Sequence, residues 1–326
     1  MTYRQAGVDT RKAAALVGDI KTHVQRTQQT RKLWGAFGLF AACYDLSAYR
    51  EPVIVTGCDG VGTKLELLLE RNLMEIAGKD LVAMSVNDIL TTGGDPLLFL
   101  DYIGIAALDE EKITRLIAGM ADYLADCDCI LAGGETAEMP GIVPTDVIEL
   151  AGFCIGCAEK PDLIDPSTIA VGDVLVGYAS DSIHANGWSL VRRVLKDHGG
   201  VSEEELAAWL KPTRLYHDVT RDLKAAGVKP KAMAHITGGG LPENLERLFR
   251  GMGADLEIPP WQMPGVAKLY AHVDAEDRFH TFNMGIGWVN IVAEKDVAAA
   301  LKAGPGGTVI GRMVEREGVR VRVSGE

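Results

Sequence analysis

The stretch TGCDGVGTKL, residues 56–65, links an apolar run at 52–58 to a run at 62–73 whose leucines recur at helical spacing. This order predicts a strand, a tight turn and a helix. Glycines in the turn let the backbone approach a bound group, and the start of the helix presents unpaired N–H groups. The glycines are Gly57, Gly60 and Gly62. The stretch predicts an anion-binding loop, with an ordinary Asp-Gly turn as the alternative.

Asp59 is an unusual residue for such a loop, because a carboxylate by itself repels a polyphosphate. A bridging Mg²⁺ ion would resolve that repulsion. The loop is not a Walker A motif, which needs G-x4-G-K-[ST], since Gly62 is followed here by Thr63 and Lys64. We therefore expect a magnesium–nucleotide site of another kind.

A helix expected over residues 79–90, KDLVAMSVNDIL, carries two acids, Asp80 and Asp88. At ~1.5 Å per residue they lie about 12 Å apart along the axis, too far to share one ion easily. Asp80 is interpreted as a first-turn acid that favours the helix dipole. Asp88 lies near the C-terminal end, where the dipole disfavours an anion, so a cation partner is expected there.

The segment AGGETAEMPG, residues 132–141, is expected to be a loop after a strand. It presents Gly133 and Gly134 together with Glu135 and Glu138, so backbone and carboxylates could meet a ligand there. Solvated loop acids are the alternative interpretation.

Two segments of the second half also place polar residues and glycines before a helix. SIHANGWSLVRR (182–193) contains His184, and AHITGGGLPENLER (234–247) has three consecutive glycines. The second arrangement suits a phosphate monoester held by backbone N–H groups. A turn with a helix cap, a structural histidine and a flexible linker remain the alternatives.

The order of apolar segments predicts an α+β fold of two α/β lobes with a cleft between them. A cluster of turn formers at 159–173 places the domain boundary near Ser167, giving domains 1–167 and 168–326. Further strands are expected at 96–108, 127–135, 147–160, 173–179, 232–237, 254–258 and 283–293, and further helices at 109–125, 186–197, 203–210 and 243–250.

The composition is that of a soluble globular enzyme, with 326 residues, 47% hydrophobic and 24% charged. A net charge of −12 disfavours nucleic acid as a partner but allows a small phosphorylated substrate. No run approaches the ~18 apolar residues of a membrane helix, and the first residues lack the apolar core of a secretory signal. We expect a cytoplasmic protein with no membrane partner.

The six cysteines do not form a zinc pattern. Cys127 and Cys129 alternate along an expected strand, and Cys154 and Cys157 form a C-x-x-C, but no spaced histidine pair follows either. We interpret them as small buried strand residues.

These motifs together resemble the phosphoribosylformylglycinamidine cyclo-ligase family, also called AIR synthetase. The resemblance runs through YRQAGVD (3–9), REPVIVTGCDGVGTKL (50–65), GKDLVAMSVNDIL (78–90), FLDYI (99–103), LAGGETAEMPG (131–141), AGFCIG (151–156), HANGWSLVRR (184–193), PTRLY (212–216), AHITGGGLPENLER (234–247) and TFNMGIG (281–287). Selenophosphate synthetase and thiamine-monophosphate kinase belong to the same superfamily.

The resemblance implies a reaction in which formylglycinamidine ribonucleotide and ATP give aminoimidazole ribonucleotide, ADP and phosphate. It implies Mg²⁺ and a homodimer in which N-lobe strands build a shared barrel. The metal ligands implied are Asp59, Asp88 and Glu135. The ATP contacts implied are Lys21, Gly57, Gly60, Gly62, Thr63, Lys64, Asp80, Gly133 and Gly134. The substrate contacts implied are Ser182, Asn186, Gly187, His235, Thr237, Gly238, Gly239, Gly240 and Asn244, with His184 as general acid–base and Asp59 and Asp88 as the other catalytic residues.

Three departures from the family pattern concern Cys58, Ala36 and the segment IVPTDVIELAGF (142–153). None removes a candidate metal carboxylate. Two alternative functions stay open at this point. One is a related ATP-dependent enzyme, such as a kinase of a phosphorylated vitamin precursor or a formylglycinamidine synthetase-like protein. The other is a catalytically silent nucleotide-binding protein.

Overall fold

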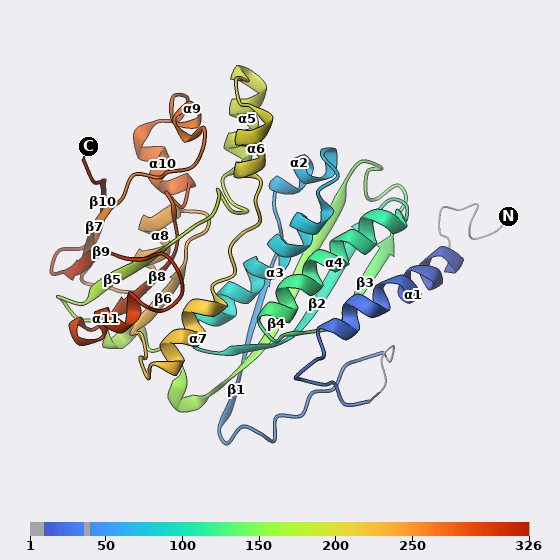
Figure 1. Ribbon diagram of the computed structural model, residues 1–326, viewed down its shortest axis with the longest axis horizontal. Helices are drawn as coiled ribbons and strands as arrows, with labels where there is room; N and C mark the ends of the chain where they lie inside the picture. The colour runs from blue at the N-terminus through green and yellow to red at the C-terminus, as the bar shows by residue number, and fades with distance from the viewer. Residues whose placement is uncertain (1–9, 36–39, 326) are drawn as a thin grey trace. The chain divides into compact units, whose positions relative to one another are not determined.

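The computed structural model describes residues 10–35 and 40–325, so Ala36 and the YRQAGVD segment lie outside the described residues. The chain divides into two compact units. The first comprises Met1–Ile89 and Gly94–Pro161, and the second comprises Leu90–Gly93 and Asp162–Glu326. Ser167 lies in a short 3-10 helix, Pro166–Thr168, shortly after this division (Figure 1).

The first unit is built on a four-stranded sheet in the order β1-β4-β2-β3. Its strands are β1 (Pro52–Asp59), β2 (Asp95–Ile105), β3 (Ile130–Glu138) and β4 (Ile148–Glu159). Strand β4 pairs antiparallel with both β1 and β2, whereas β2 and β3 are parallel. The helices are α1 (Thr10–Arg26), α2 (Lys64–Glu70), α3 (Met74–Thr91) and α4 (Glu110–Asp126).

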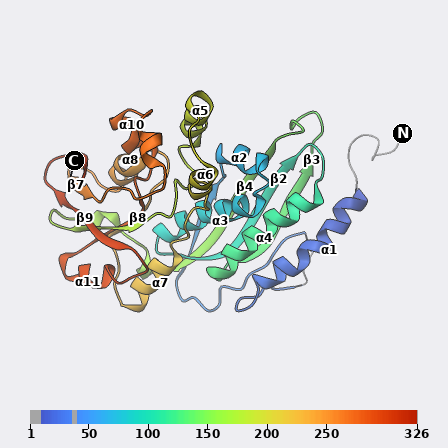
Figure 2. The ribbon, with the colours of Figure 1, turned by 45° about the horizontal axis from the view of Figure 1, so that its top comes forward.

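Helices cover one face of this sheet, and among the described residues the other face keeps exposed apolar side chains. Helices α1, α3 and α4 lie on the same face in both views (Figures 1 and 2). Phe99 and Ile103 of β2 point to that face and are fully buried. On the opposite face Ile54 is 50% and Phe153 is 41% exposed. Side chains alternate between faces along a strand, so the sheet has one buried and one open apolar surface.

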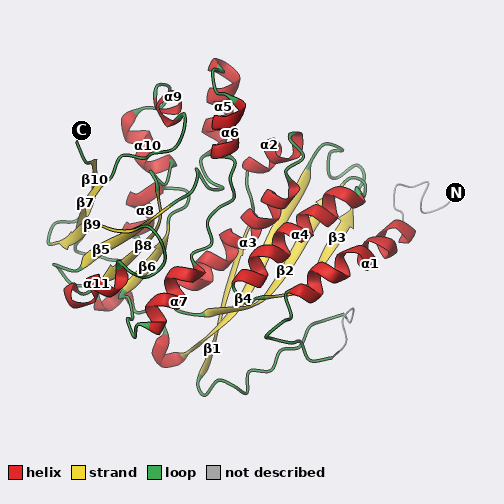
Figure 3. Cartoon of the chain, in the orientation of Figure 1, coloured by secondary structure: helices red, strands yellow, loops and turns green. Residues whose placement is uncertain are grey.

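The second unit is built on a six-stranded sheet in the order β10-β7-β9-β5-β8-β6. The strands are β5 (Val174–Ala179), β6 (Ala232–His235), β7 (Gly253–Ile258), β8 (Ile286–Val292), β9 (Gly307–Val314) and β10 (Gly318–Val323). The helices are α5 (Trp188–His198), α6 (Glu203–Trp209), α7 (His217–Ala225), α8 (Gly240–Glu246), α9 (Val266–Tyr270), α10 (Ala275–Thr281) and α11 (Val297–Ala300). Figure 3 distinguishes the helices and strands of this unit by colour. Large aromatic side chains fill its core, among them Trp188, Trp209 and Trp288.

The expected α+β architecture of two sheet-and-helix units is confirmed. None of the helices in the described ranges has the length and apolar character needed to cross a bilayer. Strands β9 and β10 were missed, although GVRVRV in β10 alternates apolar and charged residues as a half-buried strand does. They form strands through pairing with β5 and β7.

Several local predictions were wrong. Residues 132–138 are not a loop, because parallel pairing with β2 extends β3 to Glu138. Cys127 and Cys129 lie in the turn between α4 and β3 rather than in a strand. Gly57 lies inside β1. Asp80 is not a first-turn acid, since α3 begins at Met74 and places it in the middle of the helix.

Helix α3 includes Gly78, and this glycine allows α4 to come close. A Cβ atom at Gly78 would collide with the backbone oxygen of Leu116, and one at Gly119 would collide with that of Glu75. The two helices therefore touch backbone to backbone at this crossing, which fixes α3 against α4.

We expect Gly119→Ala to lower the free energy of unfolding by about 1–3 kcal/mol, because the added methyl group forces the two backbones apart. The matched control is Gly18→Ala in α1, where nothing lies within 4 Å of the added atom. That substitution should stabilise the protein by up to about 1 kcal/mol through helix propensity. Urea unfolding measures both, and a Gly119→Ala protein as stable as the parent would contradict the tight crossing.

Candidate functional site

The predicted anion loop follows the end of β1. The carboxylate Oδ1 of Asp59 accepts a hydrogen bond of 2.7 Å from the N–H of Gly60. Gly62 has a φ of 70°, which favours glycine, and Thr63 precedes the first residue of α2. Gly62 and Thr63 are exposed. The turn therefore presents backbone groups to solvent next to a carboxylate, as expected from sequence.

Lys64 and Asp80 form a buried ion pair beneath this turn. The Nζ of Lys64 lies 2.7 Å from Oδ2 of Asp80, and neither side chain has exposed surface. Burial lowers the pKa of the Lys64 ammonium, and the Asp80 carboxylate opposes that shift. The pair ties the start of α2 to the middle of α3. Neither side chain reaches the surface, so a direct contact with ATP requires a rearrangement of the turn.

Asp59 and Asp88 lie on the same face of the sheet. A Cβ at Gly57 would lie 3.6 Å from the backbone oxygen of Ser85 and 3.8 Å from Cβ of Asp88, so α3 crosses β1 at this glycine. Asp59 is two residues further along β1 and therefore points to the same side. Asp88 is exposed. This arrangement supports the expectation that the two carboxylates act together.

A third carboxylate, Asp101, lies in the same cross-strand row and was missed from the sequence. Asp59 and Asp101 are both register partners of Gly152, and Asp101 pairs in turn with Gly134. Its side chain occupies the space above Gly134, where a Cβ would collide with Oδ1. The available signal was an acid in the middle of the apolar FLDYI segment.

The Asp101 carboxylate is buried, and it has no ion-pair partner in the part of the chain that the structure describes. Burial raises its pKa to about 7, and the negative charge of Glu135 adds to the shift, while the hydrogen bond from its own backbone opposes it. Below pH 7 the folded protein therefore favours the protonated form of Asp101.

Glu135 is not brought together with Asp59 and Asp88. It pairs in register with Tyr102, on the opposite face of the sheet from Asp101 and Gly134. Across the described ranges, no group of three or more His, Cys, Asp or Glu side chains is placed to hold a metal ion. The three-carboxylate magnesium site implied by the sequence is therefore not assembled within these residues.

In the second unit, Asn283 organises the loop before α5. Its Nδ2 donates to the backbone oxygens of Ser182 and Ile183 at 3.0 and 3.1 Å. Its Oδ1 accepts from Ser180 Oγ and from the N–H of Gly285, each at 2.9 Å. Asn283 joins two loops that are far apart in sequence. It was not singled out from the sequence, although it lies in the TFNMGIG motif.

His184 lies inside the protein rather than at its surface. It is 1% exposed and has a φ of 67°. Its Nε2 accepts the N–H of Arg214 at 3.4 Å, and its ring meets Tyr216 edge to face at 6.3 Å between centroids. A Cβ at Gly287 would collide with its Cε1. This packing leaves the ring almost no exposed surface for a ligand to contact. The general acid–base role of His184 stays a prediction.

The glycine loop between β6 and α8 is held open by Asn244. The Nδ2 of Asn244 donates to the backbone oxygens of Thr237, Gly238 and Gly240 at 3.4, 3.2 and 2.7 Å. Gly239 has a φ of 91° and Gly240 a φ of 58°. Within the described residues, the N–H groups of Gly238 and Gly239 have no acceptor. The loop thus presents two unpaired backbone donors, as an anion site requires.

The remaining predicted residues are spread over both units. Asn186 lies against the glycine loop, with its Nδ2 3.7 Å from the position of a Cβ at Gly238. Gly187 has a φ of 82° and precedes α5. His235 is buried with its ring 6.5 Å from that of Trp288. Lys21 lies on α1 and is exposed.

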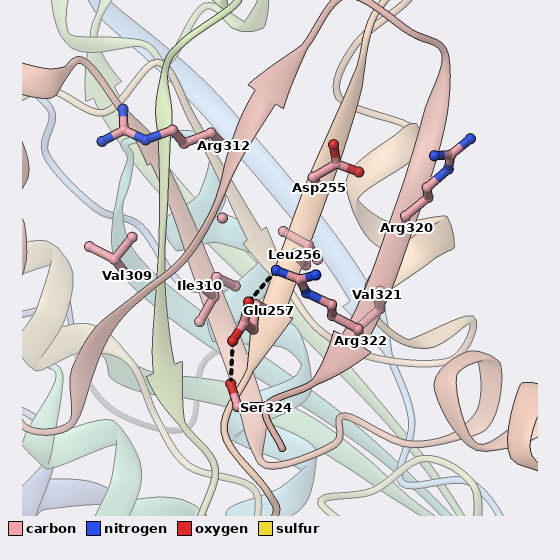
Figure 4. Close-up of a pocket in the computed structure, with 11 residues that line it drawn as sticks. Asp255, Leu256, Glu257, Val309, Ile310, Arg312, Arg320, Val321, Arg322 and Ser324 are labelled. Atoms are coloured by element: carbon pink, nitrogen blue, oxygen red, sulfur yellow. Dashed lines mark hydrogen bonds and ion pairs between the residues drawn. The ribbon is translucent and has the colours of Figure 1, made fainter. Parts of the chain in front are cut away.

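An open cavity of about 1060 Å³ lies elsewhere, against the outer face of β7, β9 and β10 (Figure 4). Its charges largely neutralise one another. Arg322 pairs with Glu257, which also accepts from Ser324 Oγ at 3.1 Å. None of the predicted site residues lines this cavity.

Two family models match the chain, one to each unit. The model described as AIR synthase related protein, N-terminal domain, matches residues 38–158, and its C-terminal counterpart matches residues 170–324. The fold and the paired matches define an AIR synthase-related protein with two domains.

The particular family follows from full-length relatives. A phosphoribosylformylglycinamidine cyclo-ligase of Oceanobacillus iheyensis is 42% identical over 97% of this chain and 98% of its own length. The chain belongs to the phosphoribosylformylglycinamidine cyclo-ligase family.

Solved structures share the fold at low identity. Thiamine-monophosphate kinase from Stenotrophomonas maltophilia is 16% identical, with a TM-score of 0.68 over 94% of this chain and 95% of that one. A hydrogenase maturation protein HypE in complex with ATP is also 16% identical, with a TM-score of 0.70 over 98% and 94% of the two chains.

The pKa of Asp101 predicts a pH dependence of stability. The pKa of Asp101 is about 7 in the folded protein, above the ordinary value of 3.8. The contribution of Asp101 to the free energy of unfolding is therefore complete below pH 3.8 and is lost as the pH rises through 7. Full ionisation costs up to roughly 4 kcal/mol. Asp101→Asn should therefore gain more stability over the parent at pH 8 than at pH 5 in urea unfolding. An equal difference at both values would show that Asp101 stays charged.

Proposed function

We propose that this chain catalyses the ATP-dependent closure of the imidazole ring in purine biosynthesis. Formylglycinamidine ribonucleotide and ATP are converted to aminoimidazole ribonucleotide, ADP and phosphate. The observation that carries the proposal is 42% identity to a named cyclo-ligase over 97% of the chain. The structure supports it with an exposed glycine turn in each unit, since the reaction uses two phosphorylated reactants.

ATP is assigned to the first unit, at the turn after β1. A protein of the same fold is described in complex with ATP. The turn offers the backbone of Gly60, Gly62 and Thr63 beside the Asp59 carboxylate. Lys64 and Asp80 hold this turn from beneath by their ion pair of 2.7 Å. Lys21 stays a candidate ATP contact because its side chain is exposed.

Magnesium fits the carboxylates of Asp59 and Asp88. Both are hard oxygen donors on one face of the sheet, and Mg²⁺ in nucleotide sites commonly takes one or two carboxylates with phosphate and water completing the shell. When bound, the ion supplies charge neutralisation for the phosphates. Glu135 faces the other side of the sheet and is left out of this set.

The substrate phosphate is assigned to the glycine loop of the second unit, residues 237–240, through the unpaired N–H groups of Gly238 and Gly239. In the reaction the γ-phosphoryl group of ATP passes to the formyl amide oxygen. The amidine nitrogen then attacks the formyl carbon and loses a proton, and phosphate leaves with that oxygen. The protein contributes position and charge neutralisation, because no covalent bond between substrate and enzyme is needed.

We assign the open face of the first sheet to a homodimer. Ile54 and Phe153 are large apolar side chains that remain half exposed there. Exposed apolar surface of this kind marks an interface. A second copy would cover it and build the barrel implied by the family resemblance. The cytoplasmic location expected from the sequence stays a prediction.

The experiment that tests the function is a product assay. The purified chain is incubated with MgATP and formylglycinamidine ribonucleotide, and products are identified by mass. Aminoimidazole ribonucleotide with one ADP per ring closed supports the proposal. A phosphorylated substrate with an open ring would indicate a kinase, and no substrate-dependent ADP would indicate a silent nucleotide-binding protein.

Asp88→Asn should lower turnover by at least about 100-fold, because it removes the charge that we assign to Mg²⁺ while keeping the volume of the side chain. The circular dichroism spectrum and thermal stability should stay those of the parent, since Asp88 is exposed. Turnover is measured as ADP release over a range of Mg²⁺ concentrations. Near-normal turnover at saturating Mg²⁺ would remove Asp88 from the site.

Phe153→Glu should convert the dimer to a monomer, because it places a charge within the proposed apolar interface. Val171→Glu in the second unit is the control, since Val171 is 52% exposed and Phe153 is 41% exposed. Light scattering after gel filtration measures the mass of each variant. A parent protein that is already monomeric, or a Phe153→Glu protein that remains dimeric, would contradict the assignment.

A further inference from the structure

We propose that the outer edge of β10 binds an extended acidic segment of a partner protein, which pairs with this edge as an additional strand. β10 is the last strand in the order β10-β7-β9-β5-β8-β6, so it has a neighbouring strand on one side only. It borders the open cavity of about 1060 Å³, which none of the predicted site residues lines (Figure 4). The proposal therefore goes beyond the proposed function and does not depend on it.

The backbone groups of β10 alternate between its two edges. In a parallel pair, every second residue directs its N–H and C=O groups to the neighbouring strand, and the residues between direct theirs away. The N–H of Ser324, directly after β10, donates to the oxygen of Ile258 in β7 at 2.9 Å. The N–H of Val319 donates instead to Oε1 of Glu246 on α8 at 3.0 Å. Even-numbered residues of β10 therefore bond to β7, and odd-numbered residues face outward.

Two of the outward residues leave their backbone groups available. The Glu246 carboxylate occupies the N–H of Val319 and so closes the first part of the edge. Among the described residues, no acceptor meets the N–H of Val321 or Val323. An extended segment beside β10 can bond to the N–H and C=O groups of both residues with its own backbone. The length of free edge suits a short strand rather than a whole sheet.

The arginines at this edge outnumber the acids that pair with them. Arg320 and Arg322 are the register partners of Asp255 and Glu257 on β7. Glu257 pairs with Arg322, but Asp255 pairs with Arg316, which precedes β10. Arg320 is exposed, it has no ion-pair partner in the described part of the chain, and its guanidinium is directed away from Asp255 (Figure 4). One positive charge therefore remains beside the free edge.

This charge selects the partner. In an added antiparallel strand, the residues opposite Arg320 and Arg322 lie on the same face as these arginines, where an acid opposite Arg320 gains an ion pair. Apolar residues fit opposite Val321 and Val323, whose side chains point to the other face. A second copy of β10 does not fit, because the register that joins the free residues of both copies places two copies of Arg322 opposite each other.

A peptide with alternating valine and glutamate, seven residues long with blocked ends, is the probe. Its binding to the full chain is measured by fluorescence anisotropy and compared with a peptide in which lysine replaces glutamate. The acidic peptide should bind at least about 10-fold more tightly. Methylation of the valine amides should abolish binding, because these amides face the edge of β10. Methylation of the glutamate amides, which face away, should leave binding in place.

Arg320→Glu should weaken binding of the acidic peptide by about 10-fold, because it replaces an attraction with a repulsion. Lys196→Glu on α5 is the matched control, since Lys196 is also exposed and without an ion-pair partner among the described residues. It changes the net charge equally and should leave binding unchanged. Neither substitution should change ring closure, so this test and the test of the proposed function can fail separately.

Two proline variants test the direction of the backbone groups. Val321→Pro removes an outward N–H, so it should abolish peptide binding and lower the Tm little. Arg322→Pro removes an N–H that bonds to β7, so it should lower the Tm more. Equal falls in Tm would overturn the assigned directions.

Three results of the binding experiments would overturn the proposal itself. The first is equal binding of the acidic and basic peptides, or no binding of either at about 1 mM. The second is an Arg320→Glu protein that binds the acidic peptide as tightly as the parent. The third is self-association of the parent that Val321→Pro removes, because a second copy would then occupy the edge.

Discussion

Helix α3 lies directly on the sheet of the first unit, and glycines at its crossing points make this approach possible. A Cβ at Gly152 would lie 2.6 Å from Phe99 Cζ and 3.0 Å from Ser85 Oγ, and one at Gly156 would lie 2.5 Å from Ile89 Cγ2. One polar contact of this interface is made by Ser85 Oγ, which donates to the Gly152 carbonyl at 3.2 Å. Close packing of this kind fixes the height and rotation of the helix.

The position of α3 sets the position of the groups that it carries. Its middle brings Asp80 to Lys64 and so anchors the turn after β1. Its last turns bring Asp88 beside Gly57, on the face that Asp59 shares. The candidate nucleotide site therefore depends on an apolar and glycine interface several residues away from it. Changes in that interface would move Asp80 and Asp88 together, because both lie on α3.

In the second unit, asparagine side chains position the candidate site loops. Asn283 and Asn244 use their amides to hold two loops, and the hydrogen bonds that they supply leave the N–H groups of Gly238 and Gly239 unpaired. Most buried polar groups are satisfied in folded proteins, so the exceptions are informative. Here Oδ1 of Asn186 in the second unit is buried without a hydrogen bond among the described residues, and Asp101 in the first unit is a buried acid without an ion-pair partner there. Both lie next to segments assigned to the site, where stability is commonly sacrificed for function.

The sequence by itself determined the two-unit α+β architecture, the turn at 59–63 and the glycine loop at 237–240. Glycine spacing, apolar periodicity and family motifs are local signals, and what they predict does not depend on partners distant in the chain. The motifs also indicated the family that the full-length relatives show.

Only the tertiary structure decided which polar residues face solvent, each other or the interior. Strand pairing turned the expected 132–141 loop into β3 and placed Glu135 on the face opposite Asp59. The start of α3 at Met74 put Asp80 inside the fold, where it pairs with Lys64. Packing around Gly287 buried His184, and register brought Asp101 into the row of Asp59. These outcomes depend on partners distant in the chain, and a local pattern carries no information about such partners.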